Sequence, residues 1–205
     1  MRSRGLFIVF EGPDKSGKST QAKLLAERLR GLGASVLHTR EPGGTSFAEE
    51  IRRILLSKKH VVDPLAELLL YEAARAQHTN ETLRPALAAG KIVVCERYTL
   101  STLVYQGYAR GIKRKVVDAA NALATGGLEA DLTVVIDLPA KEFDTRDAKR
   151  DHDRLESEPA QFRRRVRVGY KKLAPKDAIV IDGRLTIKKI QEIIFKNVRP
   201  RARGL

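Results

Sequence analysis

The sequence contains little cysteine and few aromatic residues. It has one cysteine, Cys95, and no tryptophan, and aromatic residues make up 5% of its 205 residues. A single cysteine excludes an internal disulfide framework. Because Cys95 ends the apolar run that begins at residue 92, we expect a buried, small hydrophobic side chain and not a reactive thiol.

Long apolar runs are also missing. No segment approaches the roughly 20 apolar residues that span a bilayer, so we expect no membrane partner. The apolar run at residues 6–10 is too short for the core of a signal sequence and leads directly into Glu11. These absences predict a cytoplasmic protein.

Basic residues are in large excess. The sequence has 39 lysine and arginine residues against 25 aspartate and glutamate residues, and its net charge is +14. Such a charge suits binding to nucleic-acid phosphates, a site for two phosphorylated nucleotides, or a generally basic surface, and charge alone leaves these alternatives open. The few aromatic residues show no pattern of an RNA-binding sheet, so we do not expect nucleic acid as the primary partner.

Short apolar runs alternate with helical patterns along the chain. Strands are predicted at residues 6–10, 35–39, 92–95, 132–136 and 178–181, and helices at 21–29, 47–56, 63–75, 82–89 and 187–195. This alternation predicts a parallel sheet with helices on both faces. We therefore expect one α/β domain over residues 1–205, with a P-loop type sheet of about five strands, a short lid at about 143–156 and a basic tail at about 198–205.

The segment from Gly12 to Ser19 has the pattern of a phosphate loop: a glycine, four further residues and then Gly-Lys-Ser. A strand is expected before it and a helix after it, so backbone N–H groups and the helix N-terminus can face a phosphate. Lys18 can reach the β- and γ-phosphates, and Ser19 can bind Mg²⁺. The expected contacts to the nucleotide are Gly12, Pro13, Asp14, Lys15, Ser16, Gly17, Lys18, Ser19 and Thr20.

Other features indicate a small-molecule acceptor. No guanine-reading Asn-Lys-x-Asp segment is present, which argues against a GTPase. Tyr71 and Arg75 are four residues apart on one predicted helix and can together hold a base. The alternative is a core tyrosine beside a solvated arginine.

Two charged segments have a functional and an ordinary interpretation. Glu96 and Arg97 follow a predicted strand, where side chains project into the ligand crevice of a parallel sheet. There they can hold Mg²⁺ and an acceptor phosphate, or form a surface ion pair. The segment at 143–156 is either a solvated helix or a lid that closes over ATP, and its basic residues are Arg146, Lys149, Arg150 and Arg154.

These pieces occur together, and in this order, in thymidylate kinases, and the sequence resembles that family over nearly its whole length. The resembling segments are Phe10 to Gln21 (phosphate loop), Thr39 to Thr45 (Arg-Glu-Pro-Gly-Gly-Thr segment), Leu69 to His78 (base-binding helix), Glu96 to Gly107 (acceptor signature), Asp153 to Tyr170 (the end of the lid and the next helix) and Asp182-Gly183 (beside the adenine).

The resemblance implies transfer of the γ-phosphoryl group of ATP to thymidylate, with Mg²⁺ as cofactor and a homodimer, which is typical of the family. It implies thymidylate contacts at Asp14, Arg40, Arg52, Tyr71, Arg75, Arg97, Ser101, Tyr105 and Gln106, further ATP contacts at Arg146, Arg154 and Asp182, and Mg²⁺ contacts at Ser19 and Glu96. The catalytic residues that it implies are Lys15, Lys18, Glu96, Arg97 and Arg150.

Individual roles follow from the same resemblance. Asp14 would hold the acceptor's 3′-hydroxyl, Tyr71 would stack on thymine, and Arg75 would hydrogen-bond the base. Arg52 and Arg97 would bind the monophosphate. Tyr105 would crowd the 2′ position of the sugar, and Gln106 would help to fix the base.

Three departures from the family pattern bear on catalysis. Glu96 stands where aspartate is usual, and its extra methylene moves the carboxylate by about 1.5 Å. Lys15 and the lid arginines are both present, so either can supply positive charge in the transition state. The lid is short, and Arg150 occupies about the place of a usual glycine.

Two other functions are compatible with parts of the sequence. The Glu96-Arg97 pair is also usual in deoxynucleoside kinases, although the Arg-Glu-Pro-Gly-Gly-Thr segment is not. The altered lid and Glu96 would also suit a basic nucleotide-binding or nucleic-acid-binding protein with impaired catalysis.

Overall fold

The computed structural model describes residues 4–139, 142 and 153–202. Within these residues five strands form one parallel sheet in the order β2-β3-β1-β4-β5. The strands are β1 (Phe7–Glu11), β2 (Val36–Arg40), β3 (Ile92–Glu96), β4 (Leu132–Asp137) and β5 (Ile179–Asp182). The predicted α/β fold and its five strands are confirmed.

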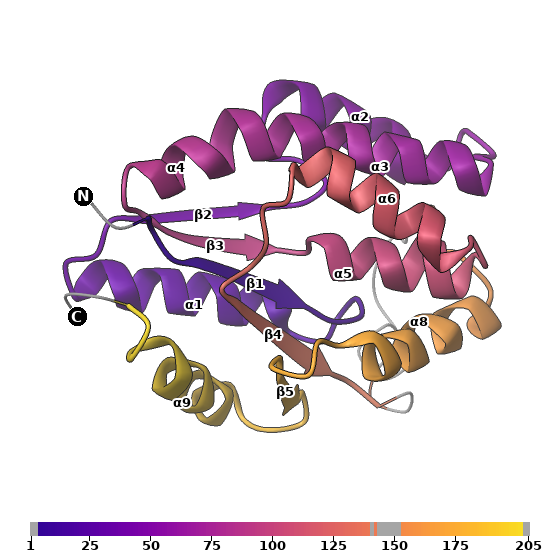
Figure 1. Ribbon diagram of the computed structural model, residues 1–205. Helices are drawn as coiled ribbons and strands as arrows, with labels where there is room; N and C mark the ends of the chain where they lie inside the picture. The colour runs from indigo at the N-terminus through magenta and orange to yellow at the C-terminus, as the bar shows by residue number, and fades with distance from the viewer. Residues whose placement is uncertain (1–3, 140–141, 143–152, 203–205) are drawn as a thin grey trace.

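Helices cover both faces of the sheet (Figure 1). Helices α1 (Lys18–Gly31) and α9 (Ile187–Val198) form one layer and pack against Ile8 and Phe10 of β1. Phe7 and Val9 point to the opposite face, where they pack against α4 (Arg84–Ala88). Successive side chains of a strand point to opposite faces, so the central strand β1 is buried along its whole length.

The second layer of helices covers the other face of the sheet. Its helices α2 (Ser46–Leu56), α3 (Pro64–His78) and α6 (Arg114–Thr125) lie above the sheet in Figure 1. Side-chain caps begin two of them: Thr45 accepts a hydrogen bond from the Ala48 amide at 3.1 Å, and Asp63 accepts one from the Leu65 amide at 2.8 Å. The remaining elements here are α5 (Thr99–Thr102), the π-helical turn η2 (Leu103–Ala109) and α8 (Ala160–Leu173).

The structure corrects the predicted break between the helices at 63–75 and 82–89. Helix α3 continues to His78, and the π-helical turn η1 (Thr79–Leu83) joins it directly to α4. Pro85 lies in the first turn of α4 and has no N–H group, so it cannot continue an ordinary α-helical hydrogen-bond ladder from α3. The wider π turn bridges this point without a loop.

The carboxyl ends of the five strands meet at one edge of the sheet. Arg40 is in register with Glu96, and Asp137 with Asp182. Cys95 is buried, as expected. Residues 143–152 of the expected lid, including Arg146, Lys149 and Arg150, lie outside the described residues, as do residues 203–205 of the tail. In the part of the chain that is described, no helix combines the length and apolar character needed to cross a membrane.

Candidate active site

The phosphate loop connects β1 to α1 and depends on glycine at two points. Gly12 has φ 137°, and a Cβ there would lie 2.4 Å from the carbonyl oxygen of Ile136, so no side chain fits. Gly17 has φ 97° and directly precedes α1. The loop therefore places the N-terminus of a 14-residue helix at the carboxyl edge of the sheet, where an anion is favoured.

Lys18 lies inside the loop. Its Nζ donates to the carbonyl of Pro13 at 3.3 Å and to Oδ1 of Asp14 at 3.4 Å. Burial, together with the charge of Arg97, lowers the pKa of Lys18. A buried ammonium group that makes only long contacts with the Pro13 carbonyl and the Asp14 carboxylate can also bind a phosphate, which brings its own negative charge.

Glu96, at the end of β3, touches two polar side chains of the site. Ser19 donates a short hydrogen bond to Oε2, and Nε2 of His38 lies 3.1 Å from Oε1. Burial alone would raise the pKa of Glu96, but the hydrogen bonds from His38 and Ser19 outweigh it and lower the pKa. The carboxylate is therefore ionised beside the Ser19 hydroxyl, as the sequence predicts for a magnesium site.

Arg97 is the centre of the polar network beside the loop. Its backbone has φ 66°, a conformation that is uncommon for a residue with a side chain and frequent at functional sites. Its guanidinium donates a short hydrogen bond to Asp14. Further acceptors are the hydroxyl of Tyr170 (2.9 Å), the hydroxyl of Ser101 (3.2 Å) and the carbonyl of Gly12 (3.3 Å).

Asp14 is held from two sides. Burial alone would raise the pKa of Asp14, but the positive charges of Arg97 and Lys18 lower it well below its usual range. Oδ2 also accepts a hydrogen bond from the hydroxyl of Tyr105 at 3.0 Å. Asp14 is thus a fixed carboxylate between the phosphate loop and the cavity next to it.

Glu11 is a buried carboxylate next to the site that the sequence does not single out. It is fully buried under Arg97 and accepts hydrogen bonds from Ser101 Oγ at 2.6 Å and from the Tyr98 amide at 2.8 Å. Burial raises the pKa of Glu11, although the hydrogen bond from Ser101 and the charge of Arg97 oppose the shift. The signal in the sequence is an acidic residue at the end of an otherwise apolar strand, directly before the phosphate loop.

Arg75 is buried, so the alternative of a solvated arginine is wrong. The side chain is 2% exposed, and its partners come from α3 itself, the segments that follow β2 and β3, α5 and α6. The partners are Glu41 Oε2 (2.7 Å), Thr102 Oγ1 (2.7 Å), Asn121 Oδ1 (2.9 Å), the carbonyl of Tyr98 (3.0 Å) and, through a short ion pair, Glu72.

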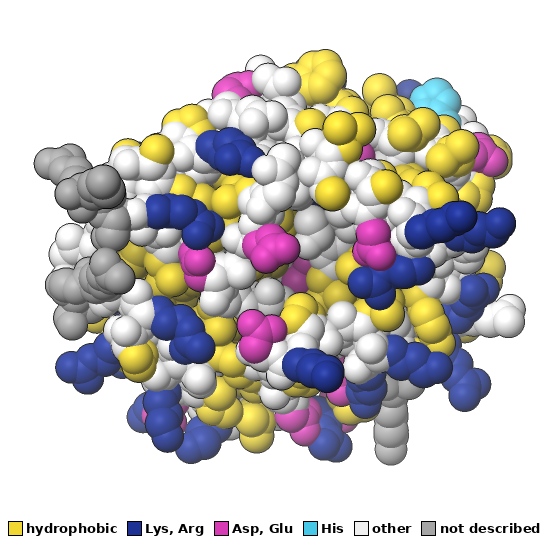
Figure 2. Space-filling model, in the orientation of Figure 1, with side chains coloured by type: hydrophobic (Ala, Val, Ile, Leu, Met, Phe, Trp, Pro, Cys, Tyr) yellow, Lys and Arg dark blue, Asp and Glu magenta, His cyan; other side chains and the backbone are white. Residues whose placement is uncertain are grey.

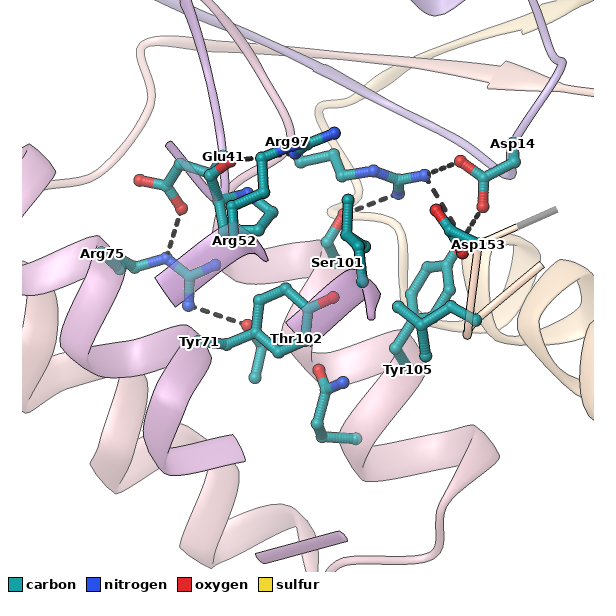
Figure 3. Close-up of a pocket in the computed structure, with 14 residues that line it drawn as sticks. Asp14, Glu41, Arg52, Tyr71, Arg75, Arg97, Ser101, Thr102, Tyr105 and Asp153 are labelled. Atoms are coloured by element: carbon teal, nitrogen blue, oxygen red, sulfur yellow. Dashed lines mark hydrogen bonds and ion pairs between the residues drawn. The ribbon is translucent and has the colours of Figure 1, made fainter. Parts of the chain in front are cut away.

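A cavity of about 550 Å³, partly open to solvent, lies between α2, α3 and η2. Figure 3 shows Tyr71, Arg75 and Thr102 toward one end and Asp14, Arg97 and Tyr105 toward the other. Eight of the nine predicted acceptor residues line it: Asp14, Arg52, Tyr71, Arg75, Arg97, Ser101, Tyr105 and Gln106. These residues come from separate segments, so no single segment of the sequence predicts that they meet in one cavity.

The ninth residue, Arg40, lies outside the lining and pairs with Glu49 at 3.0 Å. It still acts on the cavity, because burial and the charge of Arg40 lower the pKa of Arg52. Arg52 donates to the carbonyl of Pro42 at 2.9 Å. The positive charges of Arg40, Arg52 and Arg97 therefore favour an anion at this end of the cavity.

The described end of the predicted lid segment, residues 153–156, lies beside the cavity. Asp153 and Leu155 line it. Arg154, predicted to bind ATP, instead donates to the carbonyl of Leu55 at 2.8 Å and pairs with Glu67 at 2.7 Å. The structure therefore places Arg154 at the acceptor side, and its contact with ATP stays a prediction.

Asp182 lies on the other side of the phosphate loop. A Cβ on the next residue, Gly183, would lie 3.2 Å from the carbonyl oxygen of Ser16, so this turn runs directly against the loop. Hydrogen bonds from Arg184 lower the pKa of Asp182 to about 2. A contact between Asp182 and the adenine of ATP stays a prediction.

A phosphate-binding helix terminus and a separate cationic cavity open at the same edge of one parallel sheet and share Asp14. An arrangement of this kind binds a nucleoside triphosphate on one side and a small anionic acceptor on the other. The fold and the site thus define a P-loop kinase of small molecules.

Comparison with known proteins gives the family. The profile described as "Thymidylate kinase" matches residues 10–194. The thymidylate kinase of Nostoc punctiforme is 43% identical over 210 residues, which cover 98% of this chain and 99% of that protein. The crystal structure of thymidylate kinase from Ehrlichia chaffeensis matches with a TM-score of 0.79 and 35% identity, covering 96% of this chain and 99% of that one. The chain belongs to the thymidylate kinase family.

Proposed function

We propose that this protein transfers the γ-phosphoryl group of ATP to thymidylate, giving thymidine diphosphate and ADP for the synthesis of dTTP. The observation that carries the proposal is the cavity beside the phosphate loop, which joins Tyr71 and Arg75 at one end to Arg52 and Arg97 at the other. An aromatic ring and a fixed guanidinium suit a base, and clustered arginines suit a phosphate.

Asp14 and Tyr105 lie toward the same end of the cavity as Arg97, next to the phosphate loop, and the sugar of a bound nucleotide would pass close to them. The Asp14 carboxylate is ionised and can accept a hydrogen bond from a 3′-hydroxyl. Tyr105, which donates to Asp14, would crowd a 2′-hydroxyl and so favour deoxyribose. The acceptor phosphate would then face the phosphate loop, with one of its oxygens directed at the γ-phosphorus.

An acceptor phosphate oxygen is already anionic, so the reaction needs positioning and charge neutralisation more than a general base. Arg97 and Lys18 are the described cations closest to the shared Asp14 carboxylate. We expect them to lower the repulsion between acceptor and donor phosphates and to stabilise the charge that develops during transfer.

Mg²⁺ is the cofactor that the family implies, and the donor set fits it. The oxygens of Ser19 and Glu96 meet at the phosphate loop, and hard oxygen ligands with few protein contacts are typical of Mg²⁺ bound to nucleotide phosphates. When bound, the ion would neutralise phosphate charge.

The cation cluster argues against a deoxynucleoside as acceptor. A nucleoside carries no phosphate to place near Arg52 and Arg97, so the positive charge at this end of the cavity would have no anionic ligand. The cavity, lined by side chains of α2, α3 and η2, likewise suits one nucleotide and not a nucleic-acid strand. A cytoplasmic location stays a prediction from the sequence.

Product identification tests the function. With ATP, Mg²⁺ and thymidylate, ³¹P NMR should show the paired resonances of thymidine diphosphate growing as those of ATP decline. The same mixture with thymidine should give no thymidylate. Formation of thymidylate from thymidine, without thymidine diphosphate, would indicate deoxynucleoside kinase activity instead.

We also propose a homodimer that buries the outer face of α2, α3 and α6. These helices pack side by side, and their large apolar side chains on the outer face are exposed: Phe47, Ile54, Leu65, Leu69, Val116 and Leu123. Figure 2 shows hydrophobic side chains gathered over this upper part of the molecule. A contiguous apolar patch of this kind marks a protein interface. Sedimentation should give a dimer that Leu69→Arg converts to a monomer, whereas Val180→Arg, also exposed but on β5, should not.

A further inference from the structure

A carboxylate lies fully buried behind the wall of the acceptor cavity. Glu67, on α3, is 0% exposed and does not line the cavity. Its Oε1 accepts a hydrogen bond of 2.8 Å from Nε2 of Gln106, which does line it. Glu67 therefore holds the Gln106 amide by a hydrogen bond from behind the cavity wall, on the side away from a bound ligand.

Glu67 is kept ionised by its neighbours. Arg110 donates to it at 3.0 Å and 3.2 Å, and Arg154 pairs with it at 2.7 Å. Burial alone would raise the pKa of Glu67, but the hydrogen bonds from Arg110 and Gln106 outweigh burial and lower it. An ionised carboxylate has no proton to donate, so it accepts hydrogen bonds only.

We propose that Glu67 is a positioning residue that sets the base selectivity of the acceptor cavity by fixing the orientation of the Gln106 amide. Nε2 faces Glu67, and the carbonyl Oε1 is presented to the base. The reverse orientation would set Oε1 against a carboxylate oxygen inside the protein, an arrangement of two acceptors with no hydrogen bond. Among the described residues, no donor bonds to Oε1 of Gln106, so this atom is left for the ligand. The inference rests on the proposed function, in which Gln106 contacts the base.

The fixed carbonyl matches one class of pyrimidine. Thymine and uracil carry an N3–H donor, which Oε1 can accept, whereas N3 of cytosine is itself an acceptor and would be repelled. Arg75 also lines the cavity and favours the same bases. Its guanidinium is locked by Glu41 and Glu72, and it presents only donors, which suit a carbonyl oxygen at position 4 and not the amino group of cytosine.

The test compares the affinities of thymidylate and deoxycytidylate, measured by calorimetry on the full chain. In Glu67→Gln the residue at 67 can donate as well as accept, so the Gln106 amide can turn over. We expect the thymidylate-to-deoxycytidylate affinity ratio to fall about tenfold or more, because the N3–H loses its fixed acceptor. Glu67→Asp is shorter by about 1.5 Å but keeps an acceptor-only carboxylate, so it should preserve more of the ratio than Glu67→Gln does.

Arg110→Gln is the matched control. It removes a partner of Glu67 and leaves the bond between Glu67 and Gln106, so both affinities can change while their ratio stays within about twofold. A purely structural role of Glu67 would weaken both ligands equally in Glu67→Gln, and an unchanged ratio would overturn the inference. Absence of thymidylate binding to the unmodified protein would instead overturn the proposed function itself.

The unmodified protein provides a second measurement if Glu67→Gln does not fold. The side-chain amide protons of Gln106, followed by ¹⁵N-edited NMR, should be slow to exchange and should shift little when thymidylate is added, because they face Glu67. A large shift of these protons on thymidylate binding would show that the NH₂ group faces the base and would overturn the inference.

Discussion

The phosphate loop and the acceptor cavity meet at Asp14 but are built in different ways. The loop is one continuous segment, and its shape depends on glycine conformations and backbone groups. The cavity is assembled from α2, α3, η2 and the segment at 153–156, and its charges are paired in the interior, as Arg75 is with Glu41. Substitutions in the loop should therefore remove chemistry and spare the fold, whereas substitutions in the cavity should change both.

The largest effect is expected for Lys18→Ala. Lys18 bonds only weakly within the loop, so its loss should leave the unfolding midpoint nearly unchanged, but turnover should fall about a thousandfold because the phosphates lose a buried positive charge. A coupled assay of ADP release measures it. Lys23→Ala, exposed on the same helix, is the control and should have no effect. Retained turnover in Lys18→Ala would contradict the assignment of residues 12–19 as a phosphate loop.

Arg75→Met, in the acceptor cavity, should lower both the stability of the fold and the affinity for thymidylate. It leaves Glu41 and Glu72 buried without their partner, which costs about 3–5 kcal/mol in the free energy of unfolding. Thymidylate affinity should fall far more than ATP affinity. Urea denaturation and calorimetry measure the two effects, with exposed Arg53→Met as control. Equal losses for both nucleotides would contradict a role of Arg75 at the base.

Glu96→Asp tests the carboxylate at the end of β3 that contacts Ser19 beside the phosphate loop. The carboxylate of Glu96 spans His38 and Ser19, and aspartate, shorter by about 1.5 Å, cannot keep both contacts. We expect the Mg²⁺ concentration for half-maximal rate to rise about tenfold. Stabilisation by ADP in a thermal melt should need more Mg²⁺ by a similar factor. A lower Mg²⁺ requirement would mean that the longer side chain is a handicap in this site.

The smallest effect is expected at Asp182, on the exposed side of the loop. Hydrogen bonds from Arg184 hold its pKa at about 2, below the unfolded value near 3.9. A lowered pKa stabilises the fold above the unfolded value, and this contribution disappears as the pH falls toward 2. Asp182→Asn should therefore lower the melting temperature slightly at pH 5, with the difference from the unmodified protein vanishing near pH 2. A difference that grows in acid would contradict the Arg184 contact.

The contrast between the regions also explains what the sequence predicts. The phosphate loop lies in adjacent residues, so its pattern alone locates Lys18 and Ser19. The five strands are equally readable, because each is a short apolar run. Glu67 and Glu11 cannot be located from a short sequence pattern. Their hydrogen-bond partners Gln106 and Ser101 are 39 and 90 residues away.

The structure differs from the sequence prediction at two further places, Arg154 and the π turn η1. Arg154 resembles a lid residue in sequence, but its partners are on α2 and α3, and only the folded chain shows that they attract it to the acceptor side. Likewise, the π turn η1 joins two helices that Pro85 and helical spacing suggest are separate. Contacts between distant segments decide the position of Arg154, whereas the π turn follows from the missing N–H group of Pro85.

The account's central claim is that the acceptor cavity binds a deoxyribonucleotide with a thymine-like base and delivers its phosphate to ATP. The most direct measurement is ADP release from ATP and Mg²⁺ with thymidylate, deoxyuridylate, deoxycytidylate or thymidine as the sole acceptor. The account predicts turnover with thymidylate, weaker or equal turnover with deoxyuridylate, and very little with deoxycytidylate or thymidine. Turnover with thymidine or deoxycytidylate equal to that with thymidylate would contradict it.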